Sequence, residues 1–215
     1  MSGTFPTSLR HTLARMAVAD PLVWIDCEMT GLDLSADALI EVACIVTDSQ
    51  LNEVDTGCTV VIKPTDEALE QMSDFVRNMH VESGLLDELP QGTALADAQQ
   101  QVLDYVKGHV PEGSRPPLCG SSVYVDRGFL ARDMPEFDAF LHYRVLDVSS
   151  FKEVIRRWYP KVYYASPEKH GGHRALADIR ESIAELRYYR EAVLVAEPGP
   201  STAEAREIAA KFVIE

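Results

Sequence analysis

The chain has 215 residues, which is enough for one domain with a well-filled core. With 46% hydrophobic and 25% charged residues, its composition is that of an ordinary globular protein and excludes a disordered or fibrous chain. The net charge of −14, from 20 basic against 34 acidic residues, leaves no basic track for gripping long nucleic acids. This charge fits an ordinary acidic protein and equally a protein whose ligands carry few phosphates, and it does not choose between the two.

Residues 1–20 are polar and form an N-terminal extension, with Met16 as an alternative start. Arg10, His11 and Arg15 interrupt any apolar block of the kind that a secretory signal needs. No apolar stretch of the sequence approaches the roughly 20 residues that span a bilayer. We therefore expect a cytoplasmic protein without a membrane segment.

Three apolar, β-rich runs follow, at residues 22–28, 38–47 and 57–63. A Thr-Gly pair ends the first run, and polar residues at 52–55 separate the second from the third. Because the connections are short, the three runs predict an antiparallel meander.

Helical and strand-like segments alternate in the rest of the chain. The predicted helices are residues 73–79, 94–107, 127–132, 151–159 and 175–193, and the further predicted strands are residues 118–120 and 145–148. Strands that come first and then alternate with helices predict an α/β fold with a mixed sheet. We expect one domain over residues 21–194 and a C-terminal tail over residues 195–215, which contains a linker and a candidate docking helix.

The cysteines are not arranged as a metal site or a disulfide framework. They are widely spaced, without a Cys-x-x-Cys pair, at positions Cys27, Cys44, Cys58 and Cys119. Three of them lie in strand-like runs, where a buried thiol is the usual role.

Two acids stand at the end of the first predicted strand. Residues i and i+2 of a strand share a face, so Asp26 and Glu28 leave the sheet on one side and Cys27 on the other. Two carboxylates placed together at the end of an apolar strand favour a cation between them. Acids at strand ends are also commonly solvated, so the pair alone leaves both interpretations open.

Three further residues are candidates for the same functional site. Asp126 follows the fourth predicted strand and is either a metal ligand or a helix N-cap. His173 precedes the last long helix after a Gly171-Gly172 hinge. Asp178 lies about one turn inside that helix and is either a ligand or an ordinary surface acid.

Four carboxylates and one histidine suit phosphodiester hydrolysis. Two divalent ions about 3.5–4 Å apart activate a water and stabilise charge on the phosphoryl oxygens. Carboxylates are the hard ligands that Mg²⁺ and Mn²⁺ prefer. A neutral imidazole with an ordinary pKa of about 6.5 suits a general base, which assigns that role to His173.

The order Asp-x-Glu, Asp, His-x-x-x-x-Asp resembles the DEDD exonucleases that have a histidine in the last motif. Longer strings are similar to the oligoribonuclease family: WIDCEMTGL (24–32), CGSSVYVDRGFL (119–130), MPEF (134–137), HYRVLDVSSFKEVIRRWYP (142–160) and HRALADIRESIAELRYYR (173–190). The resemblance covers about residues 20–194. It implies a ribonuclease-H-like mixed sheet flanked by helices. It also implies a 3′-to-5′ exoribonuclease that cleaves short oligoribonucleotides, especially 5′-phosphorylated dinucleotides, to mononucleotides.

The resemblance further implies roles for individual residues. These are Asp26, Glu28, Asp126 and Asp178 as metal ligands, His173 and Tyr143 as catalytic residues, and Leu32, Phe75, Ser122, Ser149 and Arg144 as substrate contacts. Leu32 and Phe75 would wedge against bases, although in isolation both are typical of core residues. Tyr143 and Arg144 would reach the neighbouring site of a homodimer, although in isolation they fit a structural corner.

Ser122 and Ser149 are implied to hold the terminal 5′ phosphate of the substrate. The family often has Asn where this chain has Ser121, so we expect different local hydrogen bonds with the phosphate contact of Ser122 retained. The family often has Trp where this chain has Phe75, so we expect a somewhat weaker grip on the base. A phosphate cap at a fixed distance from the scissile bond would favour short substrates, which fits the missing basic track. The alternatives are an exonuclease acting on long DNA or RNA and a non-catalytic nucleotide-binding module.

Overall fold

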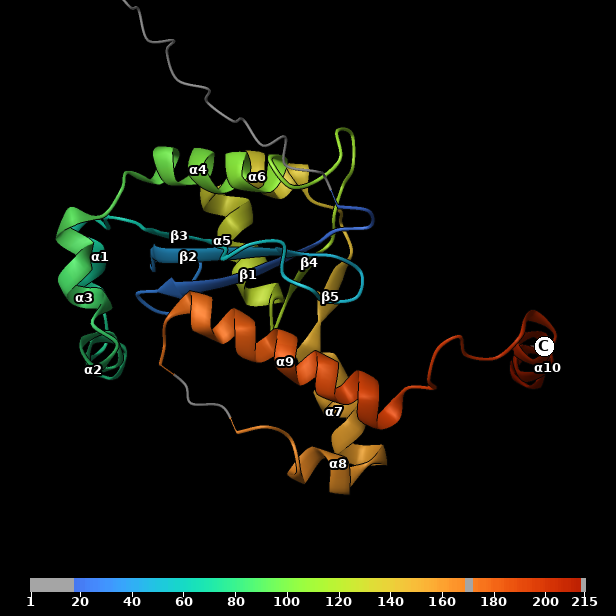
Figure 1. Ribbon diagram of the computed structural model, residues 1–215. Helices are drawn as coiled ribbons and strands as arrows, with labels where there is room; N and C mark the ends of the chain where they lie inside the picture. Colours follow the sequence, from blue (N-terminus) through green and yellow to red (C-terminus); the bar gives the residue numbers. More distant parts are fainter. Residues whose placement is uncertain (1–17, 169–171, 214–215) are drawn as a thin grey trace, which may run out of the picture.

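A computed structural model describes residues 18–168 and 172–213 of the chain. The expectations for Met16 and for Gly171 of the hinge lie outside these residues. A five-stranded sheet with the order β3-β2-β1-β4-β5 forms the centre of the molecule (Figure 1). Its strands are β1 (Leu22–Met29), β2 (Leu39–Thr47), β3 (Cys58–Val61), β4 (Leu118–Gly120) and β5 (Val145–Asp147).

The sheet is mixed, as predicted. β1 pairs antiparallel with β2, and β2 pairs antiparallel with β3, so the predicted meander is confirmed. β4 pairs parallel with β1 and with β5, because the chain returns through helices before each of these strands. β1 therefore lies in the middle of the sheet, with its end carrying the two acids.

Helices connect and cover the strands. Their bounds are α1 (Asp66–Gln71), α2 (Asp74–Glu82), α3 (Leu85–Glu88), η1 (Leu89–Gln91), α4 (Leu95–Lys107), α5 (Tyr124–Asp133), α6 (Pro135–Phe140), α7 (Val148–Trp158), α8 (Pro160–Tyr164) and α9 (Ala175–Val193). The helices α1, α3, α6 and α8 were not predicted, because pieces of one or two turns are too short to show a helical period. The structure also begins α7 at Val148, which was predicted to end a strand.

Two layers of helices enclose the sheet, as Figure 1 shows. On one face, Val23, Ile25 and Cys27 of β1 pack with residues of α4, α5 and α6. On the other face, Trp24 packs with residues of α7 and α9. Asp26 and Glu28 lie on the same face of β1 as Trp24, because alternate residues of a strand share a face, and this is the face that α9 covers.

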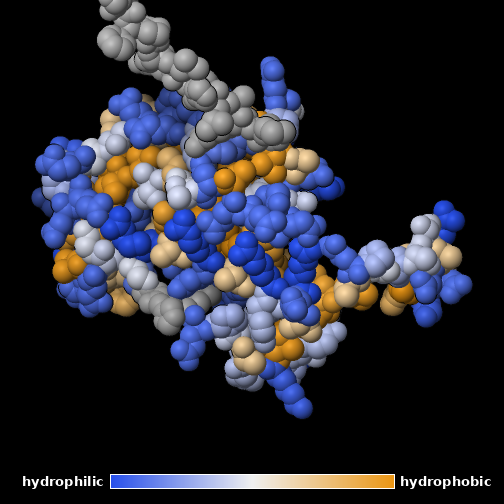
Figure 2. Space-filling view, viewed as in Figure 1, coloured by the Kyte–Doolittle hydropathy of each residue, from blue (hydrophilic) through white to orange (hydrophobic). Residues whose placement is uncertain are grey.

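The C-terminal tail contains the predicted helix, with bounds α10 (Thr202–Ala209) and a following turn η2 (Ala210–Phe212). Ser201 and Glu204 form a reciprocal capping box that fixes the start of α10. In Figures 1 and 2 this segment stands away from the body of the molecule. In the part of the chain that the structure describes, no helix combines the length and the apolar character needed to cross a membrane.

Candidate metal centre

Three carboxylates converge at the end of β1. Asp26 and Glu28 come from this strand, and Asp178 comes from the first turn of α9. One ligand oxygen from each lies within 4.8 Å of the others. The predicted positions of these acids on one face of the strand and inside the first turn of the helix agree with this arrangement.

Asp126 approaches the same strand from α5. Its Oδ1 accepts a hydrogen bond from the N–H of Cys27 at 2.9 Å, between the two acids of β1. The side chain is buried and lies inside the first turn of α5, whose N-cap residue is Val123. The alternative interpretation of Asp126 as an N-cap is therefore wrong.

Burial and mutual repulsion disfavour ionisation of these acids. Burial, followed by the charges of Asp126, Asp178 and Glu28, raises the pKa of Asp26 to about 9. Burial and the charges of Asp178 and Glu41 raise the pKa of Glu28 to about 8. Burial raises the pKa of Asp126 to about 6. Added positive charge would favour the ionised forms of these three acids at neutral pH, and an all-oxygen donor set fits a hard divalent cation such as Mg²⁺ or Mn²⁺.

His173 lies two residues before α9 and is exposed to solvent. Its backbone has φ of +47°, in the left-handed region that residues other than glycine seldom adopt. The next residue, Arg174, turns back into the protein and bonds the buried carboxylate of Glu41. The imidazole is thus carried at a sharp turn, one helical turn from Asp178.

Leu32 and Phe75 are 73% and 78% exposed, so the alternative that they are core residues is wrong. Phe75 lies in the first turn of α2, whose N-cap Ser73 accepts a hydrogen bond from the N–H of Val76. His80 of the same helix bonds the carbonyl of Met29 through Nε2 at 2.9 Å. This contact fixes α2, and with it Phe75, relative to the end of β1.

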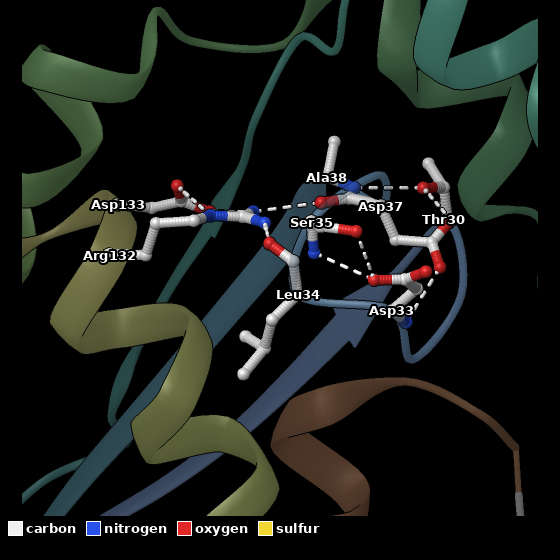
Figure 3. A network of polar contacts seen from close by, with 8 residues as sticks. All are labelled: Thr30, Asp33, Leu34, Ser35, Asp37, Ala38, Arg132 and Asp133. Carbon is white, nitrogen blue, oxygen red and sulfur yellow. Dashed lines mark hydrogen bonds and ion pairs between the residues drawn. The ribbon is translucent and has the colours of Figure 1, made fainter.

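The loop that carries Leu32 is fixed by a polar network, shown in Figure 3. The Asp37 carboxylate accepts from the Thr30 hydroxyl at 3.0 Å and from the N–H of Asp33 at 2.9 Å. Arg132 of α5 reaches across to the carbonyls of Leu34 and Asp37. The loop is therefore closed on itself and tied to the helix that carries Asp126.

Asp147 joins the two serines that were predicted to hold a phosphate. Its Oδ1 accepts from the N–H of Ser122 at 2.9 Å, from the N–H of Ser149 at 2.9 Å and from the Ser149 hydroxyl at 2.7 Å. Ser122 has φ of +55°, so this contact holds it in a strained turn. Asp147 was not predicted as a site residue, because the sequence placed it inside the strand expected over residues 145–148; in the structure it is the N-cap of α7.

Tyr143 and Arg144 precede β5, one of the two edge strands of the sheet. Tyr143 is 72% exposed, and its hydroxyl oxygen accepts from Nε of Arg144 at 3.1 Å. Arg127, next to Asp126 on α5, donates to the backbone carbonyl of Tyr143 at 3.1 Å. The backbone here is thus a structural corner, while the two side chains remain accessible.

Comparison with known proteins gives the class of protein. A family model described as an exonuclease matches residues 23–186, so the chain is an exonuclease of that family. It belongs, more narrowly, to the oligoribonucleases, and it is a hydrolase of the 3′-to-5′ exoribonuclease type. It is 65% identical over 195 residues to the oligoribonuclease of Streptomyces avermitilis, and the aligned region covers 91% of this chain and 98% of the relative. It is 56% identical over 194 residues to that of Mycobacterium sp. (strain KMS), with 90% of each chain covered.

Solved structures share the fold. The zinc-bound complex of Escherichia coli exonuclease I with single-stranded DNA matches with a TM-score of 0.64 at 15% identity, over 82% of this chain. Exonuclease I from Methylocaldum szegediense matches with a TM-score of 0.60 at 20% identity, over 81% of this chain. The chain spans about two fifths of the length of these structures, at 41% for both. The predicted ribonuclease-H-like sheet flanked by helices is confirmed.

Proposed function

We propose that this site hydrolyses the terminal phosphodiester of short RNAs from the 3′ end, with 5′-phosphorylated dinucleotides as the preferred substrates. The observation that carries the proposal is the convergence of Asp26, Glu28 and Asp178 within 4.8 Å, beside the buried Asp126. Such a set is unstable as a group of anions and suits divalent cations.

The four acids would hold two divalent ions, Mg²⁺ or Mn²⁺, which supply an activated water and neutralise charge on the phosphoryl oxygens. His173 would accept the proton of the attacking water, and its exposed position just before α9 gives it access to solvent and substrate. The exposed side chains of Leu32 and Phe75 would hold the bases.

Ser122 and Ser149 would form a cap for the 5′ phosphate, about one nucleotide from the reacting bond. Their backbones are held together by Asp147, which supports a cap of fixed position. A fixed cap measures substrate length, because a longer RNA has to occupy the same space with its chain. The net charge of −14 agrees with a substrate that presents few phosphates.

The active unit we propose is a homodimer in the cytoplasm, in which Tyr143 and Arg144 reach the neighbouring site. Both side chains stand exposed beside the edge strand β5, and Trp158 of the following helix α7 is 71% exposed. A second copy on this edge would cover the apolar side chains and bring the Tyr143 hydroxyl and the Arg144 guanidinium to a phosphate.

The test is release of mononucleotides from 5′-phosphorylated RNAs of two, five and about twenty residues, with Mg²⁺, Mn²⁺ or chelator. We expect metal-dependent cleavage that is fastest on the dinucleotide and falls steeply with length. Equal rates at all lengths would contradict the phosphate cap and indicate a general exonuclease. If no metal supports cleavage, the result would contradict the proposal and favour the alternative of a non-catalytic nucleotide-binding module.

A mixing experiment tests the dimer. Asp26→Asn and Tyr143→Phe should each inactivate the homodimer, and mixing the two variants should restore part of the activity. In a mixed dimer, one site combines an intact acid set with an intact partner tyrosine. If Tyr143 acted within its own chain, no mixed site would be complete and no activity would return.

A further inference from the structure

Glu41 is the third residue of β2, a strand that is otherwise apolar up to Thr47. It is fully buried, and it lies directly opposite Glu28 in the antiparallel pairing of β1 with β2. Like charges at directly opposed positions repel each other. A carboxylate placed at such a position needs a compensating partner, which its neighbours in the sheet do not offer.

Both oxygens of Glu41 are engaged by the segment that begins α9. Oε1 accepts from Nη2 of Arg174 at 2.9 Å and from its Nε at 3.2 Å. Oε2 accepts from the N–H of Ala175, the first residue of α9, at 3.1 Å. Arg174 occupies the N-cap position of this helix and has only donor groups, so Glu41 supplies the acceptor that a capping side chain would provide.

The segment held in this way carries two residues of the candidate metal centre. His173 immediately precedes Arg174, and Asp178 lies one turn beyond Ala175. Since His173 has φ of +47°, the chain turns sharply at this point, and the direction of the imidazole depends on how firmly the next residue is held. The other end of the contact lies in the sheet beside Glu28, so Glu41 connects the two halves of the acid cluster.

We propose that Glu41 is a positioning residue of this site: through Arg174 and the N–H of Ala175, it sets the place of His173 and Asp178 relative to Asp26 and Glu28. Glu41 is outside the group of three carboxylates that converge within 4.8 Å, and both of its oxygens bond the start of α9, so we assign it no role as a ligand. This inference rests on the proposed function for the roles of His173 and Asp178.

Arg174 also bonds Glu88 of α3 at 2.7 Å, and this second carboxylate is exposed. The chain therefore offers a matched control, since Glu88→Gln removes an acid from the same arginine without touching α9. Exposed ion pairs contribute little. Glu41→Gln keeps the shape of the side chain but places an amide N–H₂ against either the guanidinium or the Ala175 N–H.

The experiment compares Glu41→Gln, Glu88→Gln and the unchanged chain by Mn²⁺ titration calorimetry and by dinucleotide kinetics. We expect Glu41→Gln to weaken Mn²⁺ binding and to lower kcat by about 10- to 100-fold, with a much smaller change in KM, since the base and phosphate contacts are elsewhere. Glu88→Gln should leave the Mn²⁺ affinity and kcat within about threefold of the unchanged chain.

A folded Glu41→Gln variant with unaltered Mn²⁺ affinity and kcat would overturn the proposal. If that variant does not fold, Arg174→Lys replaces it: a lysine keeps the charge but loses the fork, and we expect the same loss of kcat at nearly constant KM. Unaltered kinetics in a folded Arg174→Lys variant would also overturn it. Failure of the unchanged chain to cleave RNA would contradict the proposed function, whereas the Mn²⁺ titration would still measure the effect of Glu41.

Discussion

The carboxylate of Asp126 is tied to the backbone of Cys27, whose N–H it accepts at 2.9 Å. Cys27 lies between Asp26 and Glu28, so this bond places the third acid of the set against the strand that carries the first two. Only one oxygen is needed for the bond, and the proximity of the charges contributes to the raised pKa of Asp26. A structural bond and a proposed metal ligand are thus combined in one side chain.

Asp126→Asn separates these two properties. The amide oxygen can still accept from the Cys27 N–H, and a buried carboxylate with a raised pKa is removed, so the melting temperature without metal should stay constant or rise. Activity on a dinucleotide should fall by more than about 100-fold, because the loss of a direct ligand costs more than the loss of a residue that only supports a ligand. Asp97→Asn, an exposed acid of α4, is the control and should retain its activity. Full activity of Asp126→Asn would remove this residue from the metal site.

The stability of the metal-free protein should decrease as the pH rises from about 5 to about 9. The pKa values of Asp26 and Glu28, about 9 and about 8, lie above those of the unfolded chain, so the folded state binds more protons throughout this window. Thermal melting in chelator at a series of pH values measures the slope. Asp26→Asn should flatten it, and a slope that is unchanged in this variant would contradict the raised pKa.

Divalent ions should reverse this trend. A metal competes with protons for the same carboxylates, so its binding releases protons and strengthens as the pH rises. The increase in melting temperature on adding Mn²⁺ should therefore be larger at pH 8 than at pH 6, because the pKa values of Asp26 and Glu28 are about 9 and about 8 and fewer protons compete with the metal at the higher pH. Calorimetry in two buffers of different ionisation enthalpy would count the protons released. An Mn²⁺ stabilisation that shrinks with rising pH would rule out these acids as the ligands.

Phe75→Ala and Leu32→Ala should weaken substrate binding without destabilising the fold. Both side chains are largely exposed. For the aromatic Phe75, stacking on a base is worth about 1–3 kcal/mol, which corresponds to a rise in KM of about 5- to 150-fold. Val81→Ala, an exposed apolar residue of the same helix α2 as Phe75, is the matched control. A dinucleotide KM that responds equally to Val81→Ala and Phe75→Ala would argue against a specific base contact. Phe75→Trp should lower KM, because it enlarges the stacking surface.

Asp37→Asn should act on the same binding step from a distance. Its carboxylate closes the loop of Leu32 through Thr30 and Asp33, and loss of the charge weakens both bonds (Figure 3). We expect a higher KM with nearly constant kcat. Gly31→Ala provides a second way to disturb the loop, since a Cβ on Gly31 would collide with the Asp37 carboxylate. Combining Asp37→Asn with Leu32→Ala should add little, because both changes remove the same base contact.

Local periodicity was sufficient to predict much of the fold and part of the candidate site. The two-residue period of β1 places Asp26 and Glu28 on one face, and the helical period of α9 places Asp178 in its first turn. The outer partners were not predictable in the same way. Asp147 contacts residues from two elements, and the partners of Asp37 include α5, so these contacts depend on how distant segments pack.

The sequence contains one signal for the special position of Glu41. This residue is the one acid inside the run LIEVACIVT, and an ionisable residue in a strand buried along its whole length requires a partner. The sequence does not reveal which partner this is. Arg174 directly follows His173, and it is separated from Glu41 by 133 positions in the sequence, so no local pattern connects the two residues.

The last long helix has a consequence for the nascent chain. α9 comes after every strand of the sheet, packs against β1 and β2, and brings Asp178 to the acids of β1. During synthesis, the carboxylate cluster therefore stays incomplete until nearly the whole domain has left the ribosome. A chain truncated before α9 also leaves one face of the sheet only partly covered, by α7, so an unfinished product would be inactive and recognisable to proteases by its exposed core.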